Sequence, residues 1–277
     1  MAGAHERNTK MTERISPPKV AVLTAPGVNR DLATKEAYER AGASAEVVHM
    51  TQLRGREKTL EDYQILSIPG GFSYGDHIQA GRVIALEFRD PIIADQIYEH
   101  LERGRIILGV CNGFQALVQS GLLPFGEIHP LYKNKATLTN NKPDRFQSRW
   151  IYLKPEKSVC EFVDPDLMLN IPLASGEGKF LTIDEDISQK IQESGQVVYR
   201  YCNVSGKIVD DYSTNPNGSE MNIAAICDPG GQILGMMPHA EDFVRREHHP
   251  NWRRMEKGRY PDGLKFFERI VVQAKRL

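Results

Sequence analysis

The chain has 277 residues, of which 40% are hydrophobic and 26% charged, and its formal net charge is -1. This composition is typical of a globular protein, and the near-neutral charge argues against nucleic-acid binding. Because no apolar run reaches the ~20 residues of a membrane span, we expect no membrane contact either. The length suits one α/β domain with insertions.

The N-terminal segment, residues 1–18, carries charges of both signs and ends in two prolines. It lacks the apolar core of a secretory signal, so we expect a disordered tail ahead of one domain at 19–277. The cysteines are spread too widely for a metal motif or a disulfide scaffold: Cys111, Cys160, Cys202 and Cys227. We therefore expect free thiols, no metal and a reducing, cytoplasmic location.

Apolar runs alternate with helical patterns in the first half of the chain, which predicts a parallel sheet with right-handed crossovers. The strands are expected at 19–23, 45–49, 65–68 and 106–110. The helices are expected at 31–41, 80–87 and 91–103. Asp31 is expected to be the N-cap of the first helix, and Gly42 to end it.

The second half is richer in strand patterns. Strands are expected at 149–153, 159–163, 171–174, 197–201, 223–227 and 233–237, the last two forming a hairpin around Asp-Pro-Gly-Gly. The remaining segments are expected as a loop at 121–141, a helix at 187–194, a charged insertion at 243–261 and an amphipathic helix at 263–275. The predicted fold is a mostly parallel, twisted sheet flanked by helices, with a strand-rich C-terminal part.

One cysteine lies in a pattern that favours catalysis. Residues 109–113 read Gly-Val-Cys-Asn-Gly and join the strand at 106–110 to a helical pattern. This is the cysteine counterpart of the G-x-S-x-G nucleophile elbow, in which small residues flank a side chain that points out of a tight turn. A helix N-terminus favours the thiolate at Cys111. Taken alone, the pattern also fits a buried cysteine in a connecting turn.

Two further segments support a catalytic site. Residues 65–76 form an apolar run that ends in Pro-Gly-Gly, a turn whose backbone N–H groups can point at an anionic centre. Residues 233–241 form another apolar run, which brings His239 and Glu241 to a strand end. Cysteine, histidine and acid would supply a nucleophile, a base and a group that orients the base.

Together, segments 109–115, 69–76 and 235–241 resemble class I glutamine amidotransferases. The run Gly-Phe-Ser-Tyr-Gly-Asp, the Gly-Glu-Gly at 176–178 and the tail 262–267 most resemble the glutaminase subunits of phosphoribosylformylglycinamidine synthases. The resemblance covers most of the chain from about Lys19 onward. It implies a flavodoxin-like α/β fold.

The resemblance also implies the roles of five residues. Cys111 would be the nucleophile, His239 the general base and Glu241 the acid that orients it. The backbone N–H groups of Gly71 and Asn112 would form the oxyanion hole. The resemblance further implies hydrolysis of glutamine to glutamate and ammonia.

The same resemblance implies a partner. This would be a formylglycinamidine ribonucleotide synthetase subunit, with or without a small accessory subunit, which uses the ammonia in de novo purine synthesis. The chain has no G-x-x-x-x-G-K-[ST] phosphate loop. We therefore expect no cofactor in this chain, and ATP and Mg on the synthetase.

The glutamine pocket is less well defined by the sequence. Gln115, Ser73 and Glu177 are candidate substrate contacts, although plain packing explains them equally well. Three positions depart from the family pattern and weaken any inference about partner contacts: Ser175 in place of His, Ala240 in place of Pro and Asp242 in place of Arg.

Several alternatives stay open at this level. The chain could be a glutaminase that serves another acceptor, a stand-alone cysteine hydrolase of the same fold, or a regulatory module with a redox-sensing cysteine. The adjacent pair His248-His249 suggests a metal site, but neighbouring histidines cannot easily chelate one ion and no cysteine or aspartate pair supports them. A charged loop is the preferred interpretation there.

Overall fold

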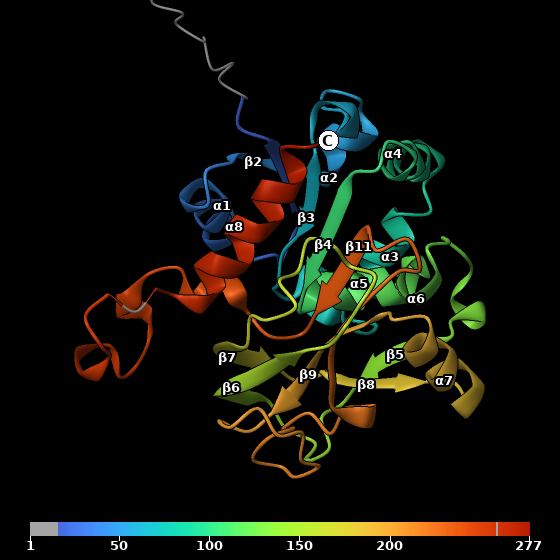
Figure 1. The fold of residues 1–277 in the computed structure, drawn as a ribbon. Coiled ribbons are helices and arrows are strands. Elements are labelled where there is room, and N and C mark those ends of the chain that lie inside the picture. The colour runs from blue at the N-terminus through green and yellow to red at the C-terminus, as the bar shows by residue number, and fades with distance from the viewer. Residues whose placement is uncertain (1–15, 259) are drawn as a thin grey trace, which may run out of the picture.

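The computed structural model describes residues 16–258 and 260–277. All but the last three positions of the expected tail at 1–18 therefore lie outside the described residues. Within the described part of the chain, one nine-stranded sheet runs in the order β2-β1-β3-β4-β11-β10-β9-β6-β7, and β5 pairs with β8 in a separate ribbon (Figure 1).

Half of the large sheet is parallel. Its strands are β2 (Ser44–His49), β1 (Lys19–Thr24), β3 (Ile65–Ile68), β4 (Ile106–Val110) and β11 (Ile233–Met236). Strands β3, β4 and β11 are buried along their whole length. Burial on both faces explains why these segments are continuous apolar runs, because helices cover a parallel sheet on both sides.

The other half is antiparallel, which confirms the expected strand-rich C-terminal part. Its strands are β10 (Ile223–Cys227), β9 (Val197–Cys202), β6 (Gln147–Pro155) and β7 (Leu169–Ser175). The hairpin of β10 and β11 is confirmed and joins the two halves. The ribbon beside the sheet consists of β5 (Ala136–Thr139) and β8 (Lys179–Thr182).

Helices lie on both sides of the parallel strands. Figure 1 shows α1 (Asp31–Arg40) beside α8 (Asp262–Ala274) on one side, and α3 (Arg82–Glu87), α4 (Pro91–Glu102) and α5 (Asn112–Ser120) on the other. The shorter helices are α2 (Met50–Arg54), α6 (Leu122–Phe125) and α7 (Glu185–Glu193). Helices α1 and α8 are joined by an edge-to-face contact of Tyr38 with Phe267, whose ring centroids are 4.8 Å apart.

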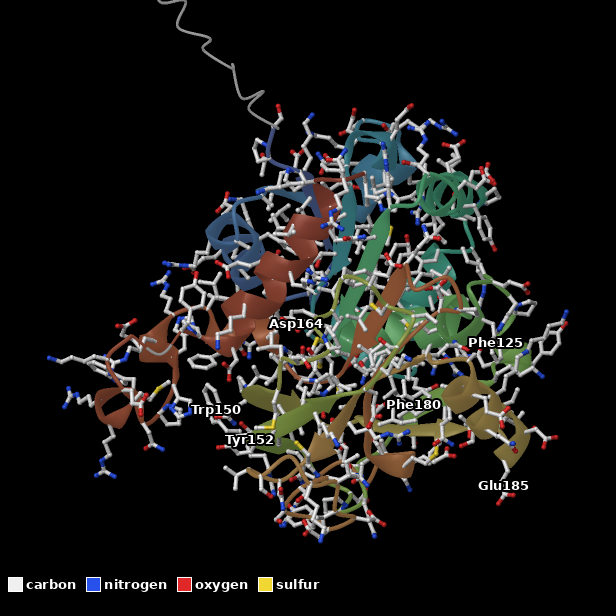
Figure 2. The ribbon with its side chains drawn as sticks, viewed as in Figure 1. Phe125, Trp150, Tyr152, Asp164, Phe180 and Glu185 are labelled. Carbon is white, nitrogen blue, oxygen red and sulfur yellow. The ribbon has the colours of Figure 1, made fainter. Side chains whose placement is uncertain are left out.

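Aromatic contacts tie the outer parts to the core. Phe180 of β8 stacks on Phe114 of α5 with ring centroids 6.2 Å apart. Trp150 of β6 meets Phe243 edge to face at 5.2 Å. Figure 2 labels Phe180 and Trp150 at these two places. The Trp150 contact anchors the start of the segment from Phe243, which extends away from the sheet as the expected insertion (Figure 1).

Three local predictions were wrong, and two elements were missed. Residues 159–163 are a loop, in which Val163 N–H donates to the Cys160 carbonyl, because a short apolar run does not by itself distinguish a strand from a packed turn. The expected loop at 121–141 contains α6 and β5, and the sequence also gave no warning of α2 or β8. Arg30, not Asp31, is the N-cap of α1; the Asp31 carboxylate instead accepts a hydrogen bond from Thr24 Oγ1 at 2.9 Å.

A buried histidine gives the fold a pH dependence. His100 of α4 is 1% exposed, and burial lowers its pKa to about 4. An unfolded histidine titrates near 6.5, so the unfolded chain binds more protons between these values. Stability is therefore complete above about pH 6.5 and is lost as the pH falls toward about 4, by about 3 kcal/mol for this group.

We expect His100→Gln to flatten this loss. Urea unfolding of both proteins between about pH 7 and about pH 4 measures the free energy of unfolding at each pH. The exposed His248→Gln is the matched control and should follow the unmodified protein. Parallel pH curves for His100→Gln and the unmodified protein would contradict the prediction.

Candidate active site

The segment around Cys111 forms the tight turn that its glycines predict. Cys111 is the N-cap of α5 and has φ 52° and ψ -106°, a conformation that L-residues rarely adopt. A Cβ at Gly113 would lie 1.9 Å from the Ile68 carbonyl oxygen, and one at Gly109 would lie 2.5 Å from Leu117 Cδ1. Both positions need glycine because α5 approaches β3 and β4 this closely.

Gly113→Ala therefore tests the elbow. We expect it to lower the free energy of unfolding by about 1–3 kcal/mol or more, because the methyl group collides with backbone that cannot move freely. Urea denaturation measures the change. Gly176→Ala is the control, since a Cβ there meets nothing nearer than Phe146 Cδ2 at 3.8 Å. Equal midpoints for the two variants would show that α5 can shift away from β3 without cost.

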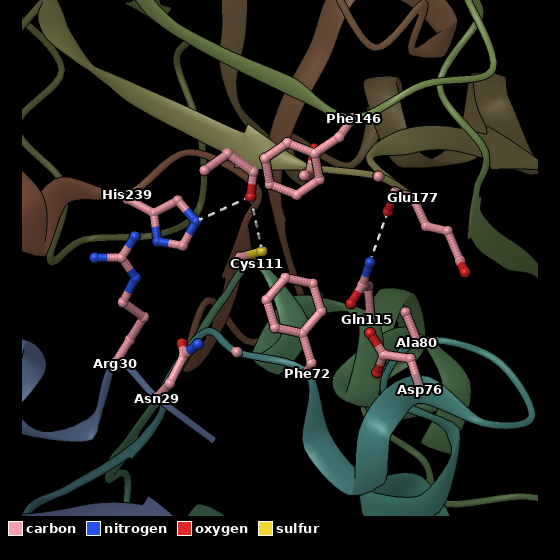
Figure 3. Close-up of a pocket in the computed structure, with 14 residues that line it drawn as sticks. Asn29, Arg30, Phe72, Asp76, Ala80, Cys111, Gln115, Phe146, Glu177 and His239 are labelled. Carbon is pink, nitrogen blue, oxygen red and sulfur yellow. Dashed lines mark hydrogen bonds between the residues drawn. The ribbon is translucent and has the colours of Figure 1, made fainter. Parts of the chain in front are cut away.

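The imidazole of His239 and the thiol of Cys111 face the same backbone oxygen. Cys111 Sγ lies 3.6 Å and His239 Nε2 3.4 Å from the Ala174 carbonyl oxygen (Figure 3). On the far side of the ring, His239 Nδ1 lies 2.7 Å from Glu241 Oε1. His239 and Glu241 are 2% and 1% exposed, so this pair is shielded from water.

Charge favours the protonated imidazole. Burial alone would lower the pKa of His239, but the Glu241 carboxylate and the Cys111 sulfur outweigh it and hold the pKa well above the ordinary value. The protonated ring donates from Nδ1 to Glu241 and presents Nε2–H on the Cys111 side.

The Pro-Gly-Gly turn lies directly against this pair. Gly71 has φ 148°, and the turn is held by a 2.9 Å hydrogen bond from Phe72 N–H to the Gly27 carbonyl. No described residue accepts a hydrogen bond from the Gly71 N–H. As the first residue of α5, Asn112 likewise has an N–H without an acceptor in the helix. Both groups are available for an anionic oxygen.

Gly70 is a site residue that the sequence reasoning missed. A Cβ at Gly70 would lie 2.8 Å from His239 Cε1 and 3.4 Å from Cys111 Cβ. A side chain here would push the imidazole away from the thiol. The Pro-Gly-Gly motif in the sequence predicts a tight turn. Only the folded structure shows that the His239 imidazole lies where a side chain at Gly70 would be.

A cavity of about 510 Å³ opens over the thiol. Of the candidate residues, the structure brings four to its wall beside Cys111: Gly71, Gln115, Glu177 and His239. Ser73 does not line the cavity; it is buried and its Oγ has no hydrogen-bond partner among the described residues. Asn112 and Glu241 are buried behind the wall. Phe72, Asp76, Phe146 and Arg30 line the cavity without having been predicted (Figure 3).

Beyond its backbone N–H, Asn112 has a side chain that is the centre of a hydrogen-bond network. Its Nδ2 donates to Asp76 Oδ1 at 3.1 Å and to Gln115 Oε1 at 3.0 Å, and its Oδ1 accepts from the Ser73 N–H at 3.2 Å. Gln115 Nε2 in turn donates to the Glu177 carbonyl at 2.7 Å. This network fixes one end of the cavity. Burial raises the pKa of Asp76, and the charge of Glu177 raises it further.

The structure shows the contacts or burial of the three residues that depart from the family pattern, Ser175, Ala240 and Asp242. Arg30 Nη1 pairs with Asp242 Oδ1 at 2.9 Å, so a guanidinium still lies at the cavity rim, supplied by another segment. Ser175 lines the cavity and its Oγ accepts from Asn217 Nδ2 at 3.1 Å. Ala240 is completely buried. No sequence pattern pointed to Arg30.

The described ranges 16–258 and 260–277 hold no group of three or more metal-ligating side chains, and no helix there is long and apolar enough to span a membrane. His249 packs against the Trp150 ring at 4.4 Å, and its Nε2 lies 3.2 Å from Asn170 Oδ1.

Comparison with known proteins decides the family. The model of the CobB/CobQ-like glutamine amidotransferase domain matches residues 17–272. The chain belongs to this family. The resemblance inferred from the three motifs is therefore confirmed, as is the α/β fold with a sheet flanked by helices.

Curated relatives in the same family share much of the sequence. Phosphoribosylformylglycinamidine synthase subunit PurQ of Dehalococcoides mccartyi is 41% identical over 265 residues, which is 95% of this chain and 100% of the relative. The subunit of the same name from Treponema denticola is 42% identical over 244 residues, 82% of this chain and 88% of the relative. A chain in the structure of PurLQS from Thermotoga maritima superposes with a TM-score of 0.68 at 29% identity, covering 93% of this chain and 99% of that one.

Proposed function

We propose that this chain is the glutaminase subunit of a phosphoribosylformylglycinamidine synthase. It would hydrolyse glutamine and pass ammonia to a synthetase subunit, which converts formylglycinamide ribonucleotide to formylglycinamidine ribonucleotide with ATP. The observation that carries the proposal is that Cys111 and His239 line one cavity and face the same carbonyl oxygen, while Glu241 bonds to the far side of the His239 ring. The relatives named phosphoribosylformylglycinamidine synthase subunit PurQ support the choice of acceptor.

The proposed reaction begins with the Cys111 thiolate. Its sulfur attacks the side-chain carbonyl carbon of glutamine, and the oxygen that becomes negative binds the backbone N–H groups of Gly71 and Asn112. The His239 imidazolium gives its Nε2 proton to the leaving nitrogen, so the C–N bond breaks and ammonia departs. The products of this half-reaction are a thioester on Cys111 and neutral His239.

Water completes the cycle. Neutral His239 takes a proton from a water molecule, whose oxygen attacks the thioester carbon. The C–S bond then breaks, the thiolate returns beside the imidazolium, and glutamate leaves after its new carboxyl group gives its proton to solvent. Glu241 keeps the ring in one orientation and stabilises its positive charge, while staying ionised throughout.

Acidic groups lie at the end of the cavity away from Cys111 and suit the positively charged α-amino group of an amino acid. Asp76 and Glu177 line the wall around Gln115, and no lysine or arginine pairs with either carboxylate among the described residues. We assign recognition of the α-amino end of glutamine to these three residues. Ser73 is given no substrate contact, because it lies behind the wall.

The synthetase supplies the chemistry that this chain lacks. ATP and Mg would bind to the partner, and we place the working complex in the cytoplasm, where a thiolate stays reduced. Ammonia released into water would become ammonium and lose its nucleophilicity. A closed path from this cavity to the partner is therefore expected.

Coupling to the partner provides the test. We expect the purified chain alone to hydrolyse glutamine slowly, and the rate to rise by a factor on the order of 10² or more with the synthetase, ATP and formylglycinamide ribonucleotide. The physical reason is the Gly71 turn, since one misaligned oxyanion donor costs a few kcal/mol and glycine peptides reorient easily. Glutamate release measures the rate.

The synthetase without the nucleotide is the control and should activate less. Equal rates for the chain alone and the full complex would favour a stand-alone hydrolase. Activation without formation of the amidine product would indicate another acceptor.

A further inference from the structure

A second cavity lies behind the wall of the first. It has a volume of about 240 Å³ and lies between the start of α3, the end of α5 and the β5–β8 ribbon. Its lining is rich in amide and hydroxyl side chains and holds one guanidinium: Gln79, Gln119, Asn134, Thr137, Thr182 and Arg82. No acidic side chain lines it among the described residues.

Arg82 is an unpaired cation in this lining. Its guanidinium forms no hydrogen bond or ion pair with any residue in the described part of the chain, and its Nε is a buried atom without a partner. A donor N–H that stays unsatisfied costs free energy, so the Arg82 guanidinium favours a ligand with oxygens that can accept from it.

A second cation, Arg89, lies close to Arg82. Arg89 uses its guanidinium on two carbonyl oxygens, those of His129 at 3.0 Å and Gln119 at 3.1 Å, rather than on a carboxylate. Burial lowers the pKa of Arg89, and the charge of Arg82 lowers it further, so the two cations lie near each other. The Glu220 carboxylate adjoins the lining, since its Oε2 accepts from Thr182 N–H and Thr182 Oγ1–H, both at 2.8 Å; its charge opposes that of the two arginines.

We propose that this cavity binds a small molecule bearing a phosphate group. The Arg82 guanidinium would take two phosphate oxygens in its planar fork, with amide and hydroxyl donors from Gln79, Gln119 and Thr137 completing the shell. The volume is smaller than that of sites for drug-sized ligands, so the ligand is a compact monoester or phosphate itself. The site is separate from the glutaminase centre and does not depend on the proposed function.

The position of the cavity gives the ligand a means to affect catalysis. Phe72, Asp76 and Ala80 line the cavity over Cys111, while Gln79 and Arg82 of the same segment line the second one. Gly81 between them packs tightly on α5, since a Cβ there would lie 2.5 Å from the Ala116 nitrogen. A phosphate bound to Arg82 therefore contacts the same segment that lines the cavity over Cys111, and this segment has little free space to move.

Isothermal titration of the purified chain tests the site, with inorganic phosphate and glycerol 2-phosphate as separate probes and sodium chloride at equal ionic strength as the blank. We expect both phosphates to bind and Arg82→Gln to weaken them about tenfold or more. Tighter binding of the monoester would show that the organic part fits the cavity, and equal binding that the phosphate group alone is recognised.

Arg103→Gln is the matched control, because Arg103 forms an exposed pair with Glu61 at 2.8 Å and should leave binding unchanged. Arg82→Lys keeps the charge but loses the fork, and is expected to bind with intermediate affinity. Thermal unfolding verifies that each variant is folded. No binding beyond the salt blank, or equal affinity of folded Arg82→Gln and the unmodified chain, would overturn the proposal.

Discussion

Cys111→Ala is expected to abolish glutamine-dependent synthesis by the complex while leaving ammonia-dependent synthesis within about twofold. Among the described residues, Cys111 supplies the only sulfur in the cavity lining. Alanine removes this sulfur, and no thioester can form without it. The synthetase chemistry takes place on the partner, so ammonia supplied from solution bypasses the missing step. Assays with glutamine and with an ammonium salt, run in parallel on one preparation, measure both rates.

Two further variants sharpen this experiment. Cys111→Ser should fail in the same way, because an alcohol has too high a pKa to be ionised by the neighbouring imidazole. Cys202→Ala is the matched control, since that thiol is buried away from the cavity and should keep both activities. If Cys111→Ala lost ammonia-dependent synthesis as severely as the glutamine-dependent reaction, Cys111 would be a structural residue and the proposed function would fail.

His239→Ala is expected to lower glutamine hydrolysis by a factor on the order of 10³ or more, because members of such a triad act as a unit. The thiolate loses its neighbouring cation, and the departing ammonia loses its proton donor. Exposed His248→Gln is the control for loss of a histidine. An unchanged rate in His239→Ala would exclude the triad.

Glu241→Gln should lose less activity than His239→Ala. It tests how the negative charge of Glu241 affects the His239 imidazole. The carboxylate helps to hold the pKa of His239 above its ordinary value, so its replacement by an amide lowers that pKa. The imidazolium then gives up its proton at a lower pH. The limb of the pH–rate profile that belongs to His239 should move toward lower pH, and an unmoved limb would show that Glu241 does not act through this ring.

Local sequence patterns were enough to predict the parallel half of the sheet and the residues of the proposed triad. The apolar runs at β3, β4 and β11 were recognisable because a strand buried on both faces needs apolar side chains throughout. Gly109, Cys111 and Gly113 were recognisable because the elbow is local, and its steric demands act within a few residues. His239 and Glu241 followed from their place just after a strand.

Which residues pack against these segments could be known only from the folded chain. The sequence of the loop at 159–163 resembles a strand, and only its contact with the 195–196 turn shows that it is a loop. Strands β5 and β8 are short, and they pair across some 40 residues of chain. Gly70 matters because His239, far away in the sequence, needs the space above it. The Arg30–Asp242 pair and the unpaired Arg82 depend on neighbours from distant segments. Periodicity reports which face of an element is buried, but not which distant side chain will meet it.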